Sequence, residues 1–287
     1  MKSALNSAPE PADLRTGTQA VERALRVLHA IAARGDAGAR LTDLVDDLGL
    51  SKPTVRRLLS ALIEQNVAAQ NAATRRYYLG LELFSLGAIA AQQIDLRRSA
   101  GDALAHLADE TQDTVFLSIP DGRDTLCIAR YEGQYPIKAL TMSVGDRRPL
   151  GVGAGSLAIL SSMQDAEIEV ILRANESRYK PYAPEISIAT LLENVRITRK
   201  ASFASSTFFL DSGKIMPGMN AIGVPILTKL GVVIGAVSVA AVPERLQAKR
   251  REQVVALAQE AAIKIAMTAQ GRGRDNTITS RSAPTAV

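Results

Sequence analysis

The chain has 287 residues and a net charge of +5, and 47 % of its residues are hydrophobic. This length favours about two domains, each able to bury a core. A single cysteine, Cys127, excludes an intramolecular disulfide, and no apolar run reaches the roughly 20 residues that a membrane span needs. With no secretory leader visible, we expect a cytoplasmic protein. Tryptophan is absent and aromatic residues make up 4 %, which argues against stacking of single-stranded bases.

The patterns along the chain predict five regions. A polar, disordered tail over 1–17 precedes a segment of short helical patterns over 18–80. A linker helix is expected over 81–100, a mixed α/β domain over 101–270 and a second disordered tail over 271–287. The chain is therefore predicted to be an α+β protein of two domains.

Three short helices are predicted in the first domain by apolar residues at helical spacing. The three stripes are Val21, Ala24, Leu25 and Leu28; Leu41, Leu44, Val45 and Leu48; and Val55, Leu58, Leu59 and Leu62. Gly49 ends the second helix, because glycine tolerates the left-handed conformation of a tight helix stop. Ser51 is an expected N-cap of the third helix, and Pro53 falls in its first turn, where proline is tolerated.

Two short helices joined by a glycine turn are typical of a helix-turn-helix, whose second helix reads DNA. If the stripe of the third helix faces the core, its outward side carries basic and hydroxyl residues that can bond to guanine edges or phosphates. The residues predicted to contact DNA here are Ser51, Lys52, Pro53, Thr54, Arg56, Arg57 and Ser60.

A hairpin with a polar tip follows, typical of the wing of a winged helix, and Arg75 and Arg76 are predicted at its tip beside DNA. Residues 52–76 carry five basic side chains against one acidic, whereas residues 18–49 carry four against five. Positive charge therefore gathers on the elements expected to face DNA. The alternative is a three-helix bundle whose basic face is merely solvated.

The second domain mixes strands and helices. Strands are predicted over 114–120, 124–133, 137–144, 221–227 and 232–242, and a helix begins near 153–156. The glycine-rich segment Gly151–Gly155 leads into this helix, so free backbone N–H groups and the helix dipole favour an anion there, with Arg147 or Arg148 nearby. Alternatively, these glycines only allow the helix to pack closely on the sheet.

No constellation for catalysis or metal binding is found in the sequence. His29 and His106 fit helix surfaces, and Cys127 lies in an apolar strand, where a thiol behaves as a small hydrophobe. One cysteine and two histidines do not compose a typical zinc site. We therefore expect no enzyme activity, no catalytic residue, no bound metal and no cofactor. Ser143 and Ser238 are lone polar residues in apolar strands, which either contact a ligand or have no role.

Several segments, taken in order, resemble one family. TQAVERALRVLHAI and LTDLVDDLGLSKPTVRRLLSALIEQN resemble the DNA-binding domain of the IclR family of bacterial regulators. GDRRPLGVGAGSLAIL, PGMNAIGVPI and GVVIGAVSVAAVPERL resemble its effector-binding domain, a GAF-like α/β sensor. The resemblance covers about residues 18–270. It implies a homodimer or homotetramer that binds a palindromic operator on double-stranded DNA and responds to a small carboxylic acid or aromatic catabolite.

The resemblance also implies which residues line the effector pocket: Gly153, Ala154, Gly155, Asp211, Met219, Ala221, Ser238 and Ala240. The chain departs from the family pattern over 201–216. Asp211 lies in this segment, so its match to the family is less certain than that of the other residues.

Three functional hypotheses follow. The first is a transcriptional regulator whose operator binding is modulated by a small-molecule effector. The second is a constitutive DNA-binding protein whose C-terminal domain only oligomerises or binds a protein partner. The third, an enzyme fused to a DNA-binding module, is disfavoured because no catalytic constellation is present. A cavity lined by 153–155, Met219 and Ser238 favours the first hypothesis, and solid packing there favours the second.

Overall fold

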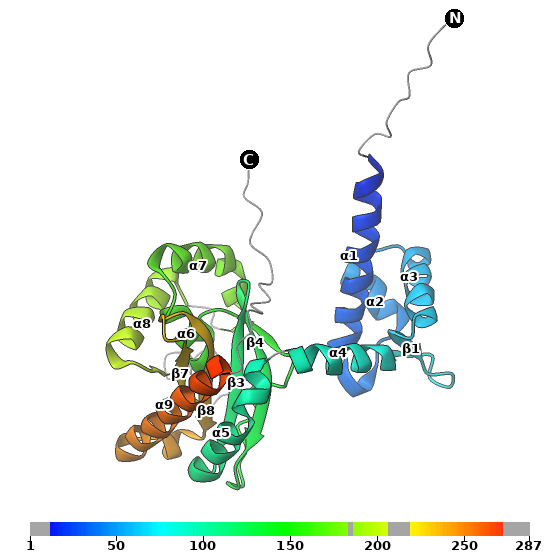
Figure 1. The fold of residues 1–287 in the computed structure, drawn as a ribbon. Coiled ribbons are helices and arrows are strands. Elements are labelled where there is room, and N and C mark those ends of the chain that lie inside the picture. The colour runs from blue at the N-terminus through cyan, green and yellow to red at the C-terminus, as the bar shows by residue number, and fades with distance from the viewer. Residues whose placement is uncertain (1–11, 94, 183–185, 206–218, 272–287) are drawn as a thin grey trace, which may run out of the picture. The chain divides into compact units, whose positions relative to one another are not determined.

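The computed structural model describes residues 12–93, 95–182, 186–205 and 219–271. They fall into two compact units, divided between Gln93 and Ile94. Figure 1 shows the order of the helices and strands within each unit. None of the helices in these ranges is both long and apolar enough to cross a membrane.

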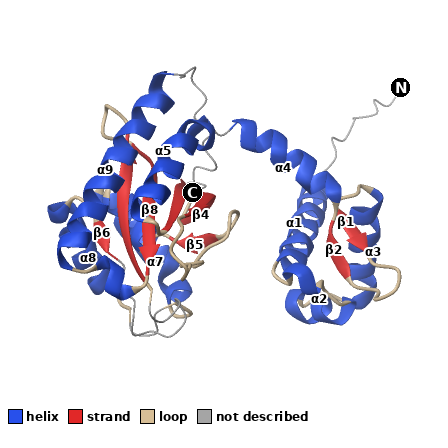
Figure 2. Cartoon of the chain, turned by 90° about the horizontal axis from the view of Figure 1, so that it is seen from below, coloured by secondary structure: helices blue, strands red, loops and turns tan. Residues whose placement is uncertain are grey.

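The first unit is a winged helix-turn-helix followed by one further helix. Its first three helices pack on one another, and a two-stranded hairpin lies beside the third of them (Figure 2). In chain order the elements are α1 (Ala12–Ala32), a 3-10 turn (Gly35–Ala37), α2 (Leu41–Leu48), α3 (Lys52–Glu64), β1 (Ala68–Gln70), β2 (Tyr77–Leu79) and α4 (Leu81–Gln93).

The local signals that define the helix-turn-helix are confirmed. Gly49 follows α2 in the left-handed conformation, with φ 64° and ψ 28°. Ser51 caps α3 by accepting a hydrogen bond from the Thr54 N–H at 3.4 Å, and Pro53 lies in the first turn. The core buries Leu44 from α2 and Val55, Leu59 and Leu62 from α3. The short stripes therefore close around one small core.

The first helix differs from its prediction in two ways. It begins at Ala12, not near Thr18. Its buried face contains Val27 and Ile31, whereas Val21 and Leu25 are 61 % and 53 % exposed. The predicted stripe thus named two residues that point away from the core, because α1 carries apolar residues on two faces.

The second unit is a six-stranded antiparallel sheet with helices on both faces. The strand order is β5-β4-β3-β8-β7-β6. The strands are β3 (Thr114–Asp121), β4 (Asp124–Glu132), β5 (Arg147–Pro149), β6 (Ala204–Ser205), β7 (Asn220–Leu227) and β8 (Val233–Ala241). The helices are α5 (Asp95–Thr111), α6 (Ala154–Ser161), α7 (Asp165–Tyr179), α8 (Ile188–Ala201) and α9 (Ala248–Gly271), with a 3-10 turn at Pro243–Leu246.

Each face of this sheet has its own core. Helices α5 and α9 cover one face and bury Leu104, Val237 and Ile265 among others. Helices α6, α7 and α8 pack on the other side of the unit around Leu157, Leu172 and Leu191. All eight residues of α6 are buried. Helix α9 buries Val254, Ala258, Ala261 and Ile265 along one stripe.

The strand predicted over 137–144 is wrong, because this segment runs as irregular chain. Two of its carbonyls accept hydrogen bonds from arginine side chains rather than from a neighbouring strand. Arg130 donates to the Met142 carbonyl at 3.3 Å, and Arg148 donates to the Thr141 carbonyl. Ser143 is consequently an exposed residue outside any strand. The short strand β5 takes the place beside β4.

A buried carboxylate ties the start of β3 to the start of α9. Asp113, whose side chain is 1 % exposed, accepts from Arg245 at 2.7 Å and from Arg250 at 2.6 Å. Both guanidinium groups also donate to the Thr111 carbonyl, and Arg245 stacks 3.9 Å from the ring centre of Tyr135. The cluster satisfies almost all of the hydrogen-bonding capacity of the carboxylate.

Candidate functional site

A concave surface lies between α3, the hairpin and the start of α2 in the first unit. Its volume is about 690 Å³, and it brings Arg56, Ser60 and Arg75 together. Arg40, Thr42, Gln70 and Thr74 also line it and were not singled out from the sequence. Arg40 directly precedes α2, at the end of a glycine- and alanine-rich turn that gives no distinctive signal.

The remaining predicted DNA contacts divide into free and engaged side chains. Lys52, Pro53 and Arg57 are exposed on α3. The hydroxyls of Ser51 and Thr54 bond to each other at 2.8 Å as part of the helix cap. Arg76 donates to the carbonyls of Ala37 and Gly38, both at 2.9 Å, so its guanidinium fastens the wing to the turn before α2.

The tip of the wing is a tight polar turn. The Asn71 side chain accepts from the N–H groups of Ala73 and Thr74 at 3.0 and 2.9 Å. Arg75 follows with φ 58°, and its side chain is exposed. This turn presents Arg75 outward, whereas Arg76 turns back into the unit.

In the second unit, a small cavity of about 50 Å³ lies at the N-terminus of α6. Seven of the residues implied by the family resemblance line it: Gly153, Ala154, Gly155, Met219, Ala221, Ser238 and Ala240. Asp211 lies outside the described residues. The lining residues meet because Phe116 on β3 and Gly223 on β7 both pair with Ser238 on β8, and α6 packs directly on these strands.

The glycines at this cavity serve two different purposes. Gly153 has φ +88°, and a side chain added there would meet only Arg148, at 3.7 Å. A Cβ on Gly155 would lie 3.2 Å from the Ser238 hydroxyl, and one on Gly223 would lie 2.3 Å from the Ala154 carbonyl oxygen. Gly155 and Gly223 therefore allow α6 to pack closely on the sheet, whereas Gly153 forms a helix start that no side chain caps.

The electrostatics of the cavity favour an anion. No side chain caps α6, so its first N–H groups are open to the cavity. Arg148 lines it half-buried and is part of no ion pair among the described residues. Burial lowers the pKa of Arg148, because it desolvates the charged form. A bound carboxylate would supply the missing counter-charge.

Sequence reasoning missed several polar groups of this cavity: Ser118, Thr125, Thr141, Ser156 and Asn220. Asn220 is 9 % exposed, and its Oδ1 has no hydrogen-bond partner among the described residues. An asparagine at the start of a strand cannot be told from an ordinary turn residue by sequence, so nothing in the sequence indicated that Asn220 lines the cavity. Its buried acceptor is available to a donor on a ligand or to a bound water.

Cys127 lies beneath the cavity in a small cluster with Phe116 and Ala240. Burial raises the pKa of its thiol to about 11, so the thiol is neutral near pH 7. Within the described residues, no group of three or more His, Cys, Asp or Glu side chains is placed to hold a metal ion.

Comparison with protein families decides the identity of the chain. The model described as "Bacterial transcriptional regulator IclR C-terminal" matches residues 88–267, and the "IclR helix-turn-helix domain" matches residues 20–72. The chain belongs to the IclR family. It is a DNA-binding transcriptional regulator with the two domains that characterise IclR proteins.

Individual IclR relatives match over most of the chain. The HTH-type transcriptional regulator KdgR of Escherichia coli is 28 % identical over 255 residues, covering 88 % of this chain and 95 % of KdgR. An IclR regulator from Alicyclobacillus acidocaldarius has the same fold, with a TM-score of 0.74, 24 % identity and coverage of 88 % and 98 %. An IclR homologue from Microbacterium hydrocarbonoxydans, solved in complex with 4-hydroxybenzoate, has a TM-score of 0.70, 19 % identity and coverage of 88 % and 99 %.

Proposed function

We propose that this IclR-family regulator binds a small carboxylic acid at the N-terminus of α6 and that the acid controls its affinity for a palindromic operator. The observation that carries the proposal is Arg148, a half-buried cation that pairs with no carboxylate of the described residues, beside an uncapped helix start. The serine hydroxyls of the cavity and the acceptor of Asn220 would orient the ligand. The homologue solved with 4-hydroxybenzoate, an aromatic carboxylate, supports a screen of such acids.

We propose a separate role for each region of the chain. Residues 18–80 bind DNA, 81–100 link the domains and 101–270 bind the effector, in the cytoplasm where the operator lies. The split between Gln93 and Ile94 supports a boundary inside the proposed linker. The relatives are named as regulators, which supports a regulatory rather than a catalytic role.

For DNA recognition we propose three groups of residues with different tasks. Lys52, Arg56, Arg57, Ser60 and Arg75 contact DNA directly, which their exposure or their place in the concave surface supports. Pro53, Ser51 and Thr54 shape the first turn of α3. Arg76 positions the wing through its two backbone bonds.

We expect replacement of Arg57 with alanine to weaken operator binding by about 1–3 kcal/mol, the cost of losing one base-reading arginine. Arg251→Ala on α9 removes the same charge from an exposed position in the other unit and is the control. Gel shifts with DNA from upstream of the protein's own gene, at several salt concentrations, provide the measurement. Equal losses on operator and on unrelated DNA would assign Arg57 to phosphate, and no loss would remove α3 from recognition.

The effector site is tested by a matched pair of neighbouring arginines. Arg148→Met should lower the affinity for a carboxylate effector by about 2 kcal/mol, the worth of a hydrogen bond to a charged group. Arg147→Met should leave it nearly unchanged, because Arg147 pairs with Asp121 at 2.8 Å and does not line the cavity. Calorimetric titration with 4-hydroxybenzoate and related acids measures both variants. Similar losses in the two variants would contradict a specific role for Arg148.

A homodimer is proposed from the apolar surface of the first unit. On α4, Leu81, Phe84 and Ile89 are 84 %, 76 % and 57 % exposed, and α1 adds Val21 and Leu25. Exposed apolar side chains in such number mark an interaction surface. A dimer joined through these helices would present two copies of α3 to a palindromic site.

A second function is favoured by one observation, the small volume of the cavity. About 50 Å³ accommodates few water molecules, which suits a C-terminal domain that only oligomerises or binds a protein partner. The effector titration separates the two functions, because a constitutive DNA-binding protein keeps the same operator affinity with every acid added.

A further inference from the structure

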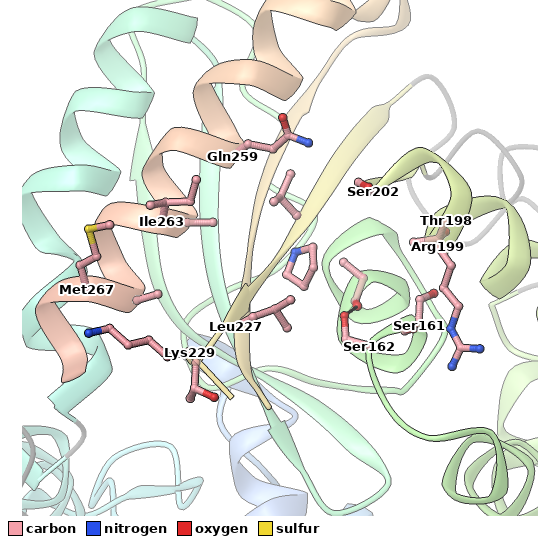
Figure 3. Close-up of a pocket in the computed structure, with 16 residues that line it drawn as sticks. Ser161, Ser162, Thr198, Arg199, Ser202, Leu227, Lys229, Gln259, Ile263 and Met267 are labelled. Carbon is pink, nitrogen blue, oxygen red and sulfur yellow. Dashed lines mark hydrogen bonds between the residues drawn. The ribbon is translucent and has the colours of Figure 1, made fainter. Parts of the chain in front are cut away.

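A groove of about 610 Å³ lies in the second unit, away from the start of α6. Figure 3 shows its walls: Ile263 and Met267 on α9 face Ser161 at the end of α6 across β7, from which Leu227 projects. Lys229 stands at the turn after β7, beside the α9 wall (Figure 3). The volume falls in the range of small-molecule sites, and the lining is mainly apolar with a few polar groups, as such sites require.

The groove exists because the edge of the sheet is only partly covered. Strand β6 pairs with Ile222 and Gly223, and within the described residues no strand lies beside the remainder of β7 on that side. Pro225 occupies this uncovered half and lines the groove. Because proline has no N–H to donate, the edge is a poor template for an added peptide strand. A ligand that binds by apolar contact suits it better.

Two polar groups define what such a ligand must carry. The Ser161 side chain lines the groove, the residue is 4 % exposed, and its buried Oγ has no hydrogen-bond partner among the described residues. Arg199 is already committed to Asp165 and to the carbonyls of Ser161 and Met163. Lys229 is exposed and enters none of the ion pairs of the described residues, so it is the cation open to an anionic head group.

We propose that this groove binds a medium-chain carboxylic acid. The apolar chain lies against Leu227, Ile263 and Met267, a carboxylate oxygen of the ligand bonds to Ser161, and Lys229 on the opposite wall attracts the acid by its charge. The proposal is independent of the effector proposed above, because the groove and the cavity at the start of α6 have no lining residue in common. The groove is therefore a second ligand site on the same domain.

Decanoate titrated against the full-length protein, with displacement of a dansylated fatty acid as the readout, tests the site. Ile263→Glu places a carboxylate on the exposed wall and should weaken binding at least about tenfold. Val170→Glu is the matched control, since Val170 is similarly exposed on α7 and lies outside the groove. Arg148→Met should leave decanoate affinity unchanged, so failure of the effector proposal and failure of this one are distinguishable. Equal affinity in wild type and Ile263→Glu would overturn the site.

Ser161→Ala and Lys229→Ala test the two polar contacts. Ser161→Ala should weaken decanoate binding about fivefold without lowering the midpoint of unfolding, because the hydroxyl has no partner in the protein. Lys229→Ala should weaken decanoate but not decanol, which has no charge. If decanoate does not bind and Ile263→Glu instead changes the sedimentation of the protein, the groove is a contact between copies of the chain and the proposal is wrong.

Discussion

Replacing Asp113 with asparagine is expected to lower the free energy of unfolding of the second unit by about 3 kcal/mol. The substitution keeps the shape but removes the charge that two arginines share, at 2.7 and 2.6 Å. Breaking a buried pair is costly because the remaining charge stays desolvated. The expected loss lies at the low end of the range for breaking a buried ion pair. Arg245 and Arg250 remain 20 % and 34 % exposed, so water can solvate them in part.

Urea unfolding followed by circular dichroism measures this effect, and Asp121→Asn is the matched control. Asp121 pairs with Arg147 at 2.8 Å, but that arginine is 48 % exposed. Ion pairs of this kind contribute about 0–1 kcal/mol. Equal destabilisation by the two substitutions would show that burial of Asp113 does not set its importance.

Gly223→Ala is expected to destabilise the second unit by about 3 kcal/mol, the upper part of the range for overpacking. The new Cβ would lie 2.3 Å from the Ala154 oxygen and 2.7 Å from the Gly155 nitrogen. These are backbone atoms of the first turn of α6, so no side chain can rotate away and the helix itself must shift. Affinity for a carboxylate effector should fall as well, because the same turn supplies the proposed N–H donors.

Gly122→Ala is the control that distinguishes steric overlap of the new methyl group from strain in the backbone. Gly122 has φ +60° and nothing within 4 Å of an added Cβ. Its replacement should therefore cost only the roughly 1–2 kcal/mol of a left-handed residue and leave effector binding intact. Unfolding midpoints and calorimetric titration of both variants provide the comparison. A loss at Gly223 no greater than at Gly122 would mean that α6 accommodates the methyl group.

The helix-turn-helix could be predicted from sequence because its signals are local. A glycine stop, a serine cap and apolar stripes are decided within a few residues, and α2 and α3 follow them. Periodicity did not decide which apolar face of α1 is buried, because Val21 and Leu25 lie as regularly as Val27 and Ile31. Which face packs inward depends on the partners that the unit supplies.

The remaining differences arise from contacts between distant residues. The segment 137–144 alternates like a strand, yet its carbonyls are held by Arg130 and Arg148. Arg76 was grouped with Arg75 by sequence, but the carbonyls that it binds lie nearly forty positions earlier. The glycine segment before α6 carried a local signal and does lead to a helix start. The groove along β7 has no such signal, because three helices and a strand edge must assemble before it exists.

The complete burial of α6 has a consequence for how this unit moves. All eight residues of the helix are buried between the sheet and the neighbouring helices, so only small parts of its surface reach solvent. A surface helix can fray and re-form alone, whereas α6 has no route to opening that leaves its surroundings intact. Exchange of its amide hydrogens with solvent therefore requires the opening of the whole unit, and α6 belongs to its slowest-exchanging, last-melting part.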